Sequence, residues 1–155
     1  MKLEQEIKQS KFRNEYHKLA VNLIFSNSWL MNLQSNLFKK FHITGNQYNI
    51  LRILRGQYPN PAKVNLLKER MVDRMSDASR LVERLRVKGF VKRELCPNDR
   101  RSVDIIILDK GLKLLADIDK LNDDYDSFFK KLSKAEAEKL NDLLDKMRGR
   151  VIFNK

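Results

Sequence analysis

The residues best suited to chemistry lie in two short runs that combine arginines with short hydroxyl and carboxylate side chains. They are Ser76, Asp77, Ser79, Arg80 and Arg84 in the first run, and Asp99, Arg100 and Arg101 in the second. Guanidinium groups form paired hydrogen bonds with guanine edges and phosphates, and serine hydroxyls reach base edges and phosphate oxygens. These residue types therefore predict contacts with a nucleic acid.

The first run falls on one face of a predicted helix, residues 76–88. At about 100° per residue, the opposite face is apolar, and its members are Ala78, Leu81, Val82 and Leu85. We expect Ser76, Ser79 and Arg80 to meet base edges in a major groove and Arg84 to meet a phosphate. A solvated helix face is the alternative for any one of these residues.

Glu83 is out of place on this polar face because its carboxylate would repel phosphate. We expect it to pair with a neighbouring arginine, and a contact with a cytosine amino group is the alternative.

The second run belongs to a predicted β-hairpin. Residues 90–95 and 102–108 are rich in β-formers and flank the turn sequence Cys96-Pro-Asn-Asp99. An arginine at the tip of such a wing enters a narrow, A·T-rich minor groove, and Asp99 is placed to hold Arg101 there. The alternative is a surface ion pair that contributes at most about 1 kcal/mol.

The elements that must position these residues are mainly helical. Apolar residues recur at helical spacing over 11–42, with a possible break near 26–28, and Thr44 to Gln47 forms a capping box before a short helix. Gly56 suits the left-handed residue that closes this short helix, and residues 56–62 are predicted to form a connector. A predicted helix over 64–71 is then separated from the helix over 76–88 by a short turn, which is the spacing of a helix-turn-helix motif.

Two long helices are predicted after the hairpin. A stripe runs from Leu115 to Leu132, and a capping box from Ser133 to Glu136 opens the last helix. Apolar stripes longer than one small domain can cover predict a homodimer, whereas a monomer would fold its termini back onto its own core.

Charge and composition limit the function. The formal net charge is +12, and residues 63–101 carry twelve bases against six acids, which favours a polyanionic partner on that segment. With eight bases against ten acids, residues 109–146 do not share the excess. No apolar run approaches the roughly 18 residues of a membrane span, and residues 1–10 are polar, so we expect a cytoplasmic protein without membrane contact.

Catalytic and metal chemistry find no support in the residue pattern. Cys96 is the one cysteine, and with His17 and His42 it does not supply zinc-ligand spacing. No glycine-rich phosphate loop and no nucleophile with a base at a recognisable spacing are present. We therefore expect no enzyme activity, metal or cofactor.

Four segments together resemble the MarR family of winged helix-turn-helix regulators. They are Ser76-Asp-Ala-Ser-Arg-Leu-Val-Glu-Arg-Leu85, Lys88-Gly-Phe-Val91, Asp99-Arg-Arg101 and Ile107-Leu-Asp-Lys-Gly111. The Asp-x-Arg pair of the family's wing corresponds to Asp99 and Arg101. The resemblance implies a single domain over 1–155, in which 44–108 form the DNA-binding lobe and 11–42 and 112–150 are dimerisation helices.

The same resemblance implies a function. A homodimer is expected to bind a near-palindromic duplex, to act as a repressor, and to be released by a small aromatic effector. Residues of the first helix that would line an effector pocket are Tyr16, His17, Phe25, Trp29, Phe38 and His42; packing in the core or interface is the alternative for each. The alternative function is a winged-helix module for protein interaction or RNA binding.

Overall fold

The computed structural model describes residues 2–96 and 99–149. It is mainly helical with one small antiparallel sheet, as the sequence predicted. The described residues form two compact units, one up to Leu114 and the other from Leu115 onward. Within the described ranges, no helix is long and apolar enough to cross a membrane.

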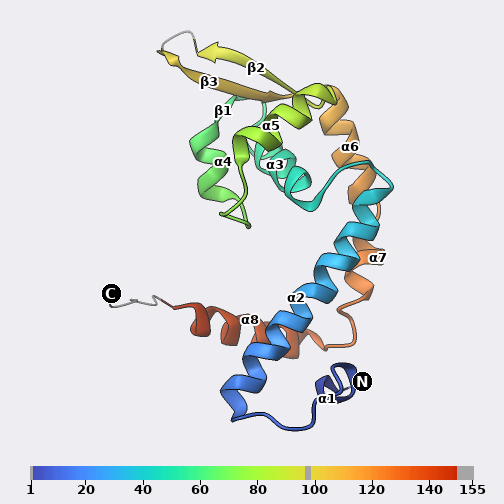
Figure 1. The fold of residues 1–155 in the computed structure, drawn as a ribbon. Helices are drawn as coiled ribbons and strands as arrows, with labels where there is room; N and C mark the ends of the chain where they lie inside the picture. Colours follow the sequence, from blue (N-terminus) through green and yellow to red (C-terminus); the bar gives the residue numbers. More distant parts are fainter. Residues whose placement is uncertain (1, 97–98, 150–155) are drawn as a thin grey trace, which may run out of the picture. The chain divides into compact units, whose positions relative to one another are not determined.

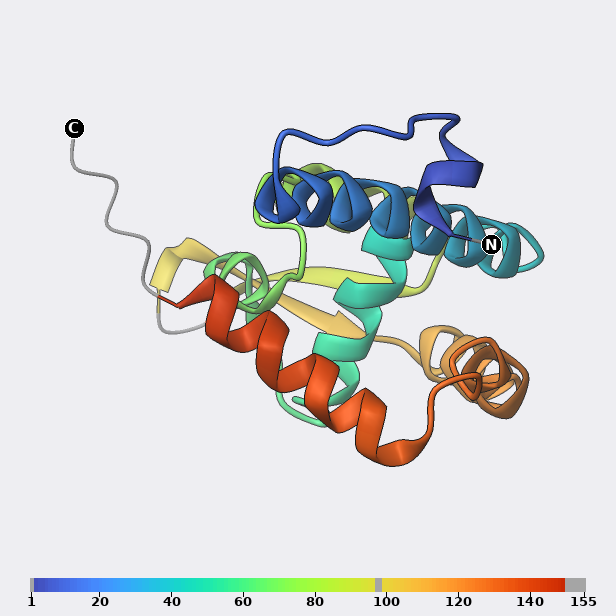
Figure 2. The ribbon, with the colours of Figure 1, turned by 90° about the horizontal axis from the view of Figure 1, so that it is seen from below.

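The first unit begins with a short helix and a long one. Helix α1 (Leu3–Glu6) buries Leu3 and is joined to the long helix by an ion pair between Glu4 and Lys18 of 2.5 Å. Helix α2 (Glu15–Lys39) is uninterrupted, so the break expected near residues 26–28 is wrong (Figures 1 and 2). The expected start at residue 11 is also too early, since Asn14 is the N-cap and accepts a hydrogen bond from the backbone of His17 at 2.9 Å.

Three helices follow and form the helix-turn-helix lobe. Helix α3 (Gly45–Arg55) opens with the predicted capping box of Thr44 and Gln47. Helix α4 (Val64–Arg70) and helix α5 (Ala78–Val87) come next, so the second helix of the motif starts two residues later than predicted. The left-handed conformation expected at Gly56 is wrong, because its φ of −68° continues the helical geometry. Gly89 has the positive φ instead, at 74°, directly after α5.

The lobe is closed by a sheet of three strands in the order β1-β3-β2. Strands β2 (Val91–Cys96) and β3 (Asp99–Ile107) form the predicted hairpin, and β1 (Ala62–Lys63) pairs with Ile105 and Asp104 of β3. Figure 1 shows α3, α4 and α5 on one face of this sheet. The sequence did not predict β1, since a strand of two residues is too short to show alternation.

The core of the lobe is formed by apolar side chains that are at most 1% exposed. They are Ile50, Leu51, Leu54, Leu67, Ala78, Val82, Leu85, Val91 and Ile105. Three of them come from α5, and they lie on the face that the sequence assigned to the core. Their burial leaves the opposite face of α5 turned outward.

The single long helix expected from the stripe over residues 115–132 is wrong. Helix α6 (Asp109–Asp119) ends at a turn, and the short helix α7 (Asn122–Ser127) follows it. Asn and Asp are weak helix formers because their side chains compete for backbone hydrogen bonds, and they cluster at residues 119–126. Helix α8 (Lys134–Arg148) has the predicted capping box of Ser133 and Glu136.

Candidate nucleic-acid interface

Helix α5 presents a polar, outward face that begins at a capped N-terminus. The carboxylate of Asp77 accepts the backbone N–H of Arg80 at 3.1 Å, so this residue is the N-cap rather than a free side chain. Ser79, Arg80 and Arg84 are exposed, and Val87 on the same face is 74% exposed. The free backbone N–H groups and positive dipole of a helix N-terminus favour an anion in front of it.

Ser76 lies outside the helix that was predicted to carry it. Its hydroxyl accepts a hydrogen bond from Asn46 Nδ2 at 2.6 Å and donates one to Asp73 Oδ2 at 2.6 Å. These contacts leave the hydroxyl engaged in the turn before α5, and the side chain is half-buried. A contact between Ser76 and a base edge would have to compete with both bonds.

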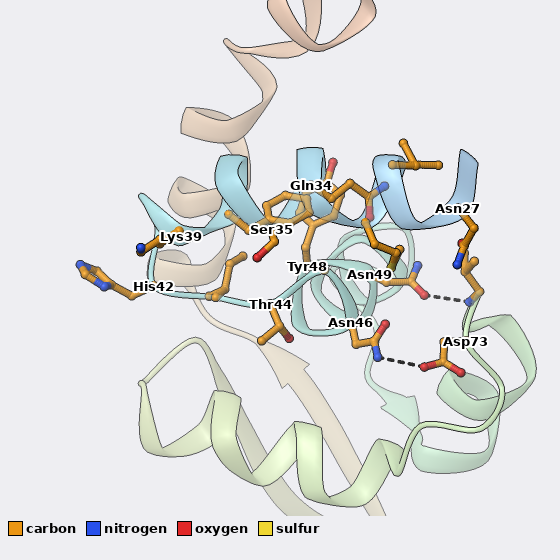
Figure 3. A pocket seen from close by; sticks show the side chains of 16 residues that line it. Asn27, Gln34, Ser35, Lys39, His42, Thr44, Asn46, Tyr48, Asn49 and Asp73 are labelled. Carbon is orange, nitrogen blue, oxygen red and sulfur yellow. Dashed lines mark hydrogen bonds between the residues drawn. The ribbon is translucent and has the colours of Figure 1, made fainter. Parts of the chain in front are cut away.

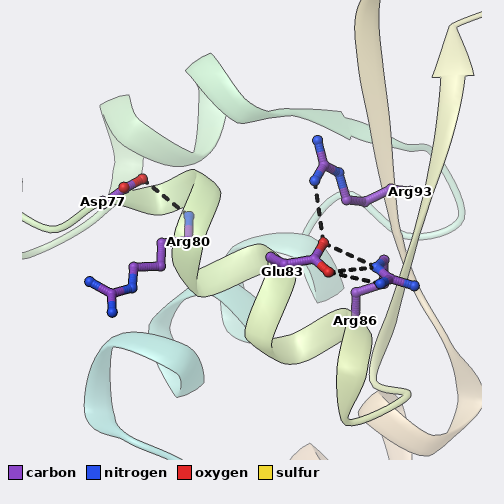
Figure 4. Close-up of polar contacts among 5 residues, drawn as sticks. All are labelled: Asp77, Arg80, Glu83, Arg86 and Arg93. Carbon is purple, nitrogen blue, oxygen red and sulfur yellow. Dashed lines mark hydrogen bonds and ion pairs between the residues drawn. The ribbon is translucent and has the colours of Figure 1, made fainter.

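Glu83 is paired with arginines, as the sequence predicted. Arg86 donates three hydrogen bonds of 2.8–3.1 Å to its carboxylate, and Arg93 of β2 donates one of 3.4 Å (Figure 4). The Arg86 hydrogen bonds, followed by the charges of Arg86 and Arg93, lower the pKa of Glu83, and Glu83 in turn raises the pKa of Arg86. In Figure 4 the Arg80 side chain points away from this cluster.

Around the turn of the wing, only the backbone of residues 96 and 99–102 is described. Asp99, Arg100 and Arg101 belong to the first part of β3, and their side chains lie outside the described structure, as do residues 97 and 98. That Asp99 holds Arg101 stays a prediction. Further along the hairpin, Lys92 and Glu94 form an ion pair of 2.7 Å on β2.

A groove of about 1020 Å³ lies between α2 and the start of α3 (Figure 3). Phe38 and His42 are the two residues of the predicted effector set that line it, and the other four do not. Among those four, Tyr16 is 83% exposed, and His17 contacts Phe12 ring to ring at 5.8 Å. The remaining lining residues are Asn27, Leu30, Met31, Gln34, Ser35, Lys39, Ile43, Thr44, Gly45, Asn46, Tyr48, Asn49, Val72 and Asp73.

Several polar residues around α5 were missed by the sequence reasoning. Asn49 accepts the backbone N–H of Val72 at 2.9 Å, and Lys88 Nζ donates to Gln47 Oε1 at 3.4 Å and to the carbonyl of His42. For Gln47 the capping box gave a partial signal, because it fixed that side chain at the helix start. The other contacts join residues far apart in sequence, and no local pattern marks them.

The described part of the chain contains no group of three or more His, Cys, Asp or Glu side chains arranged to hold a metal ion. The chemistry of the exposed face is therefore that of arginines, hydroxyls and one paired carboxylate. Such a set binds anions and base edges through hydrogen bonds.

Comparison with known proteins agrees with this geometry. The model of the MarR family matches residues 43–103. A mutant of MarR from E. coli in complex with operator DNA is 25% identical, with a TM-score of 0.76 over 90% of this chain and 99% of that chain. No curated protein matches the sequence.

Two further solved structures share the fold and were determined in connection with small molecules. BpsR from Bordetella bronchiseptica, whose DNA binding is regulated by 6-hydroxynicotinic acid, is 19% identical, with a TM-score of 0.76 over 91% of this chain and 100% of that chain. The organohalide-sensing regulator RdhR, bound to 2,4-dichlorophenol, is 17% identical, with a TM-score of 0.79 over 90% of this chain and 85% of that chain.

The family match covers the helix-turn-helix and most of the hairpin, and the structural matches extend over most of the chain. Members of this family are transcription regulators rather than enzymes. Residues 43–103 match the MarR family, and the chain shares the fold of solved MarR-type transcription regulators.

Proposed function

We propose that two copies of this chain bind one near-palindromic stretch of duplex DNA and repress transcription from it. In this proposal the exposed face of α5 enters the major groove, and Arg101 of the wing enters the adjacent minor groove. The observation that carries it is the outward face of α5, where Ser79, Arg80 and Arg84 are exposed while Ala78, Val82 and Leu85 on the opposite face are buried.

Homodimerisation is supported by apolar side chains that stay exposed on two helices. On α8, Leu140, Leu143 and Met147 share one helical face and are 45%, 50% and 45% exposed. On α2, Ile24 and Met31 are 71% and 50% exposed. Exposed apolar faces of this kind are covered by a partner in stable proteins, and a second copy is the commonest partner.

Control by a small molecule is the third part of the proposal, with the groove beside α2 and α3 as its site. Phe38, Tyr48 and Leu30 supply apolar surface for a planar ligand, and side-chain amides such as those of Asn27 and Gln34 supply hydrogen-bonding groups. Regulation of BpsR by 6-hydroxynicotinic acid and the dichlorophenol complex of RdhR support a small aromatic ligand.

The experiment that tests DNA binding is selection of binding sites from random duplexes by the purified chain. The expected result is an enriched site with two inverted half-sites whose centres lie about 34 Å apart, one turn of the double helix. With about eight to ten phosphate contacts per dimer, the logarithm of the binding constant should fall against the logarithm of salt concentration with a slope of roughly −7 to −9. An enriched site without symmetry would contradict the dimer, and a slope near zero would contradict duplex binding.

Effector control is tested on the selected duplex with two named probes, 6-hydroxynicotinic acid and 2,4-dichlorophenol. Release of the duplex by either probe, and loss of that release in Phe38→Ala, would support the groove. Probe binding that Phe38→Ala leaves unchanged would place the ligand elsewhere.

A further inference from the structure

Helix α5 is attached through polar contacts near both of its ends to consecutive residues of α3. Before its N-terminus, Asn46 Nδ2 donates to Asp73 Oδ2 at 3.1 Å and to Ser76 Oγ at 2.6 Å. At its C-cap, Lys88 Nζ donates to Gln47 Oε1 at 3.4 Å. The first turn of α3 therefore contacts the chain on both sides of the segment that carries Ser79, Arg80 and Arg84.

The C-terminal attachment rests on a fixed acceptor. Gln47 is 2% exposed and is held by the capping box, in which its Oε1 accepts the backbone N–H of Thr44 at 3.1 Å. A carbonyl oxygen has two lone pairs, so the same atom also accepts the Lys88 ammonium. Lys88 further donates to the carbonyl of His42, which ties the end of α5 to the α2–α3 junction.

The N-terminal attachment is more accessible. Asn46 and Asp73 both line the groove, and Figure 3 shows the hydrogen bond between their side chains. Asp73 also accepts the hydroxyl of Ser76 at 2.6 Å and the backbone N–H of Met75 at 3.1 Å, so its carboxylate organises the turn from which α5 starts.

The polar contacts hold the two ends of α5, whereas apolar packing holds its middle. Burial of Ala78, Val82 and Leu85 fixes which face points inward, but hydrophobic contact is non-directional and tolerates small rotations and shifts. Side chains that read base edges must be held within about 0.5 Å of the productive geometry. Directional hydrogen bonds at the two ends supply the constraint that the apolar middle lacks.

We infer that Asn46 and Asp73 are positioning residues for DNA recognition: their hydrogen bond fixes the N-terminal end of α5 relative to α3, while Gln47 and Lys88 fix its other end. The inference rests on the proposed function, because it takes α5 as the helix that enters the major groove. It predicts that loss of the Asn46–Asp73 bond lowers discrimination between sequences more than it lowers general affinity for duplex DNA.

The test exchanges the two residues. Asn46→Asp alone sets two carboxylates against each other, and we expect the affinity ratio between the selected duplex and a scrambled one to fall about tenfold, the effect of one misplaced base contact. Asp73→Asn combined with Asn46→Asp restores a donor and an acceptor in reversed order at unchanged net charge. The ratio should then return to within about threefold of that of the unmodified protein, because the effects of two contacting residues are coupled.

The matched control is Asn60→Asp, which adds the same charge at an exposed position of the same lobe. It should weaken binding to the selected and the scrambled duplex equally and leave the ratio unchanged. Circular dichroism checks that Asn46→Asp is folded. If it is not, Asn46→Ala removes the donor without adding charge and is expected to lower the ratio in the same way.

Three outcomes are distinguishable. A ratio unchanged in folded Asn46→Asp or Asn46→Ala would overturn the inference, because the bond would then be merely structural. A ratio that falls in the single variant but is not restored by the exchange would also overturn it, since a restored donor and acceptor between the two positions would then not restore discrimination. Failure of the unmodified protein to bind any duplex would refute the proposed function itself.

Discussion

Glu83 and Arg86 lie one turn apart on α5 and are joined by three hydrogen bonds of 2.8–3.1 Å. The same carboxylate accepts a hydrogen bond from Arg93 of β2 at 3.4 Å, so one acid restrains one arginine of α5 and one of the hairpin. The pairing removes the repulsion that an isolated carboxylate would exert on phosphate. In the proposed complex with DNA, it also keeps both guanidinium groups from binding the DNA backbone without regard to sequence.

Glu83→Gln should therefore strengthen binding to scrambled duplex and reduce discrimination. Release of Arg86 and Arg93 adds about one to two phosphate contacts per subunit, or about two to four per dimer, which steepens the salt slope by about the same number. Stability should hardly change, because exposed ion pairs contribute about 0–1 kcal/mol. The measurement is a titration of both duplexes across salt concentration.

The matched control for that variant is Glu138→Gln on α8, which removes the same charge from an ion pair with Lys134 in the second unit. It should alter neither the slope nor the discrimination. Equal effects in the two variants would show that net charge, and not release of the arginines, is responsible.

Arg101→Ala tests the wing. Loss of a minor-groove arginine should weaken binding to the selected duplex by about 1 to 3 kcal/mol and leave the fold intact. Lys131→Ala, a change of the same charge at an exposed position outside the lobe, is the control. Unchanged affinity in Arg101→Ala would remove the wing from the interface.

The elements around these residues differ in how well the sequence predicts them. The capping boxes at Thr44 and Ser133 were predicted and are confirmed, because a cap is decided by residues within one turn. The break in the helix expected over 115–132 was missed, because the apolar stripe continues across the turn and the weak helix formers lie between its apolar residues. Gly56 was assigned the left-handed conformation that Gly89 adopts.

In the candidate site, too, the sequence predicts features that depend on neighbouring residues and misses contacts between residues far apart in the chain. The buried and outward faces of α5 follow from helical periodicity, and the pairing of Glu83 follows from the cost of an unpaired acid on that face. The bond between Asn46 and Asp73 joins residues 27 positions apart, and it depends on how α3 packs against the turn before α5. Neither residue carries a sequence pattern that would reveal this contact.

Leu143→Glu tests the proposed dimer. A charge in the middle of the apolar face of α8 must be desolvated if a second copy covers that face, so the variant should sediment as a monomer. Asn141→Glu adds the same charge at a neighbouring exposed position and should leave the dimer intact. Dimers of equal strength in both variants, measured by sedimentation equilibrium, would exclude this face from the interface.

Gly111→Ala tests why a glycine stands near the start of α6. A Cβ at this position would lie 2.6 Å from the carbonyl oxygen of Phe90 and 2.9 Å from Ile107 Cγ1, and the backbone oxygen has little room to move. Overpacking of this kind should lower the free energy of unfolding by about 1–3 kcal/mol. Gly45→Ala is the control, because its Cβ would meet ordinary contacts of 3.5 Å or more, and equal loss of stability in the two variants would contradict the steric explanation.

Asp73 should make the stability of the helix-turn-helix lobe sensitive to acid. The hydrogen bonds from Ser76 first, then from Asn46 and the backbone of Met75, lower the pKa of its carboxyl group. A carboxyl whose pKa is lower in the folded state stabilises the fold above its unfolded pKa, about 3.9, and loses that contribution as pH falls through the folded value. Urea unfolding of Asp73→Asn should consequently show a smaller decline in stability between about pH 5 and pH 2 than the unmodified protein. Identical declines in the two proteins would mean that the carboxylate does not hold the turn.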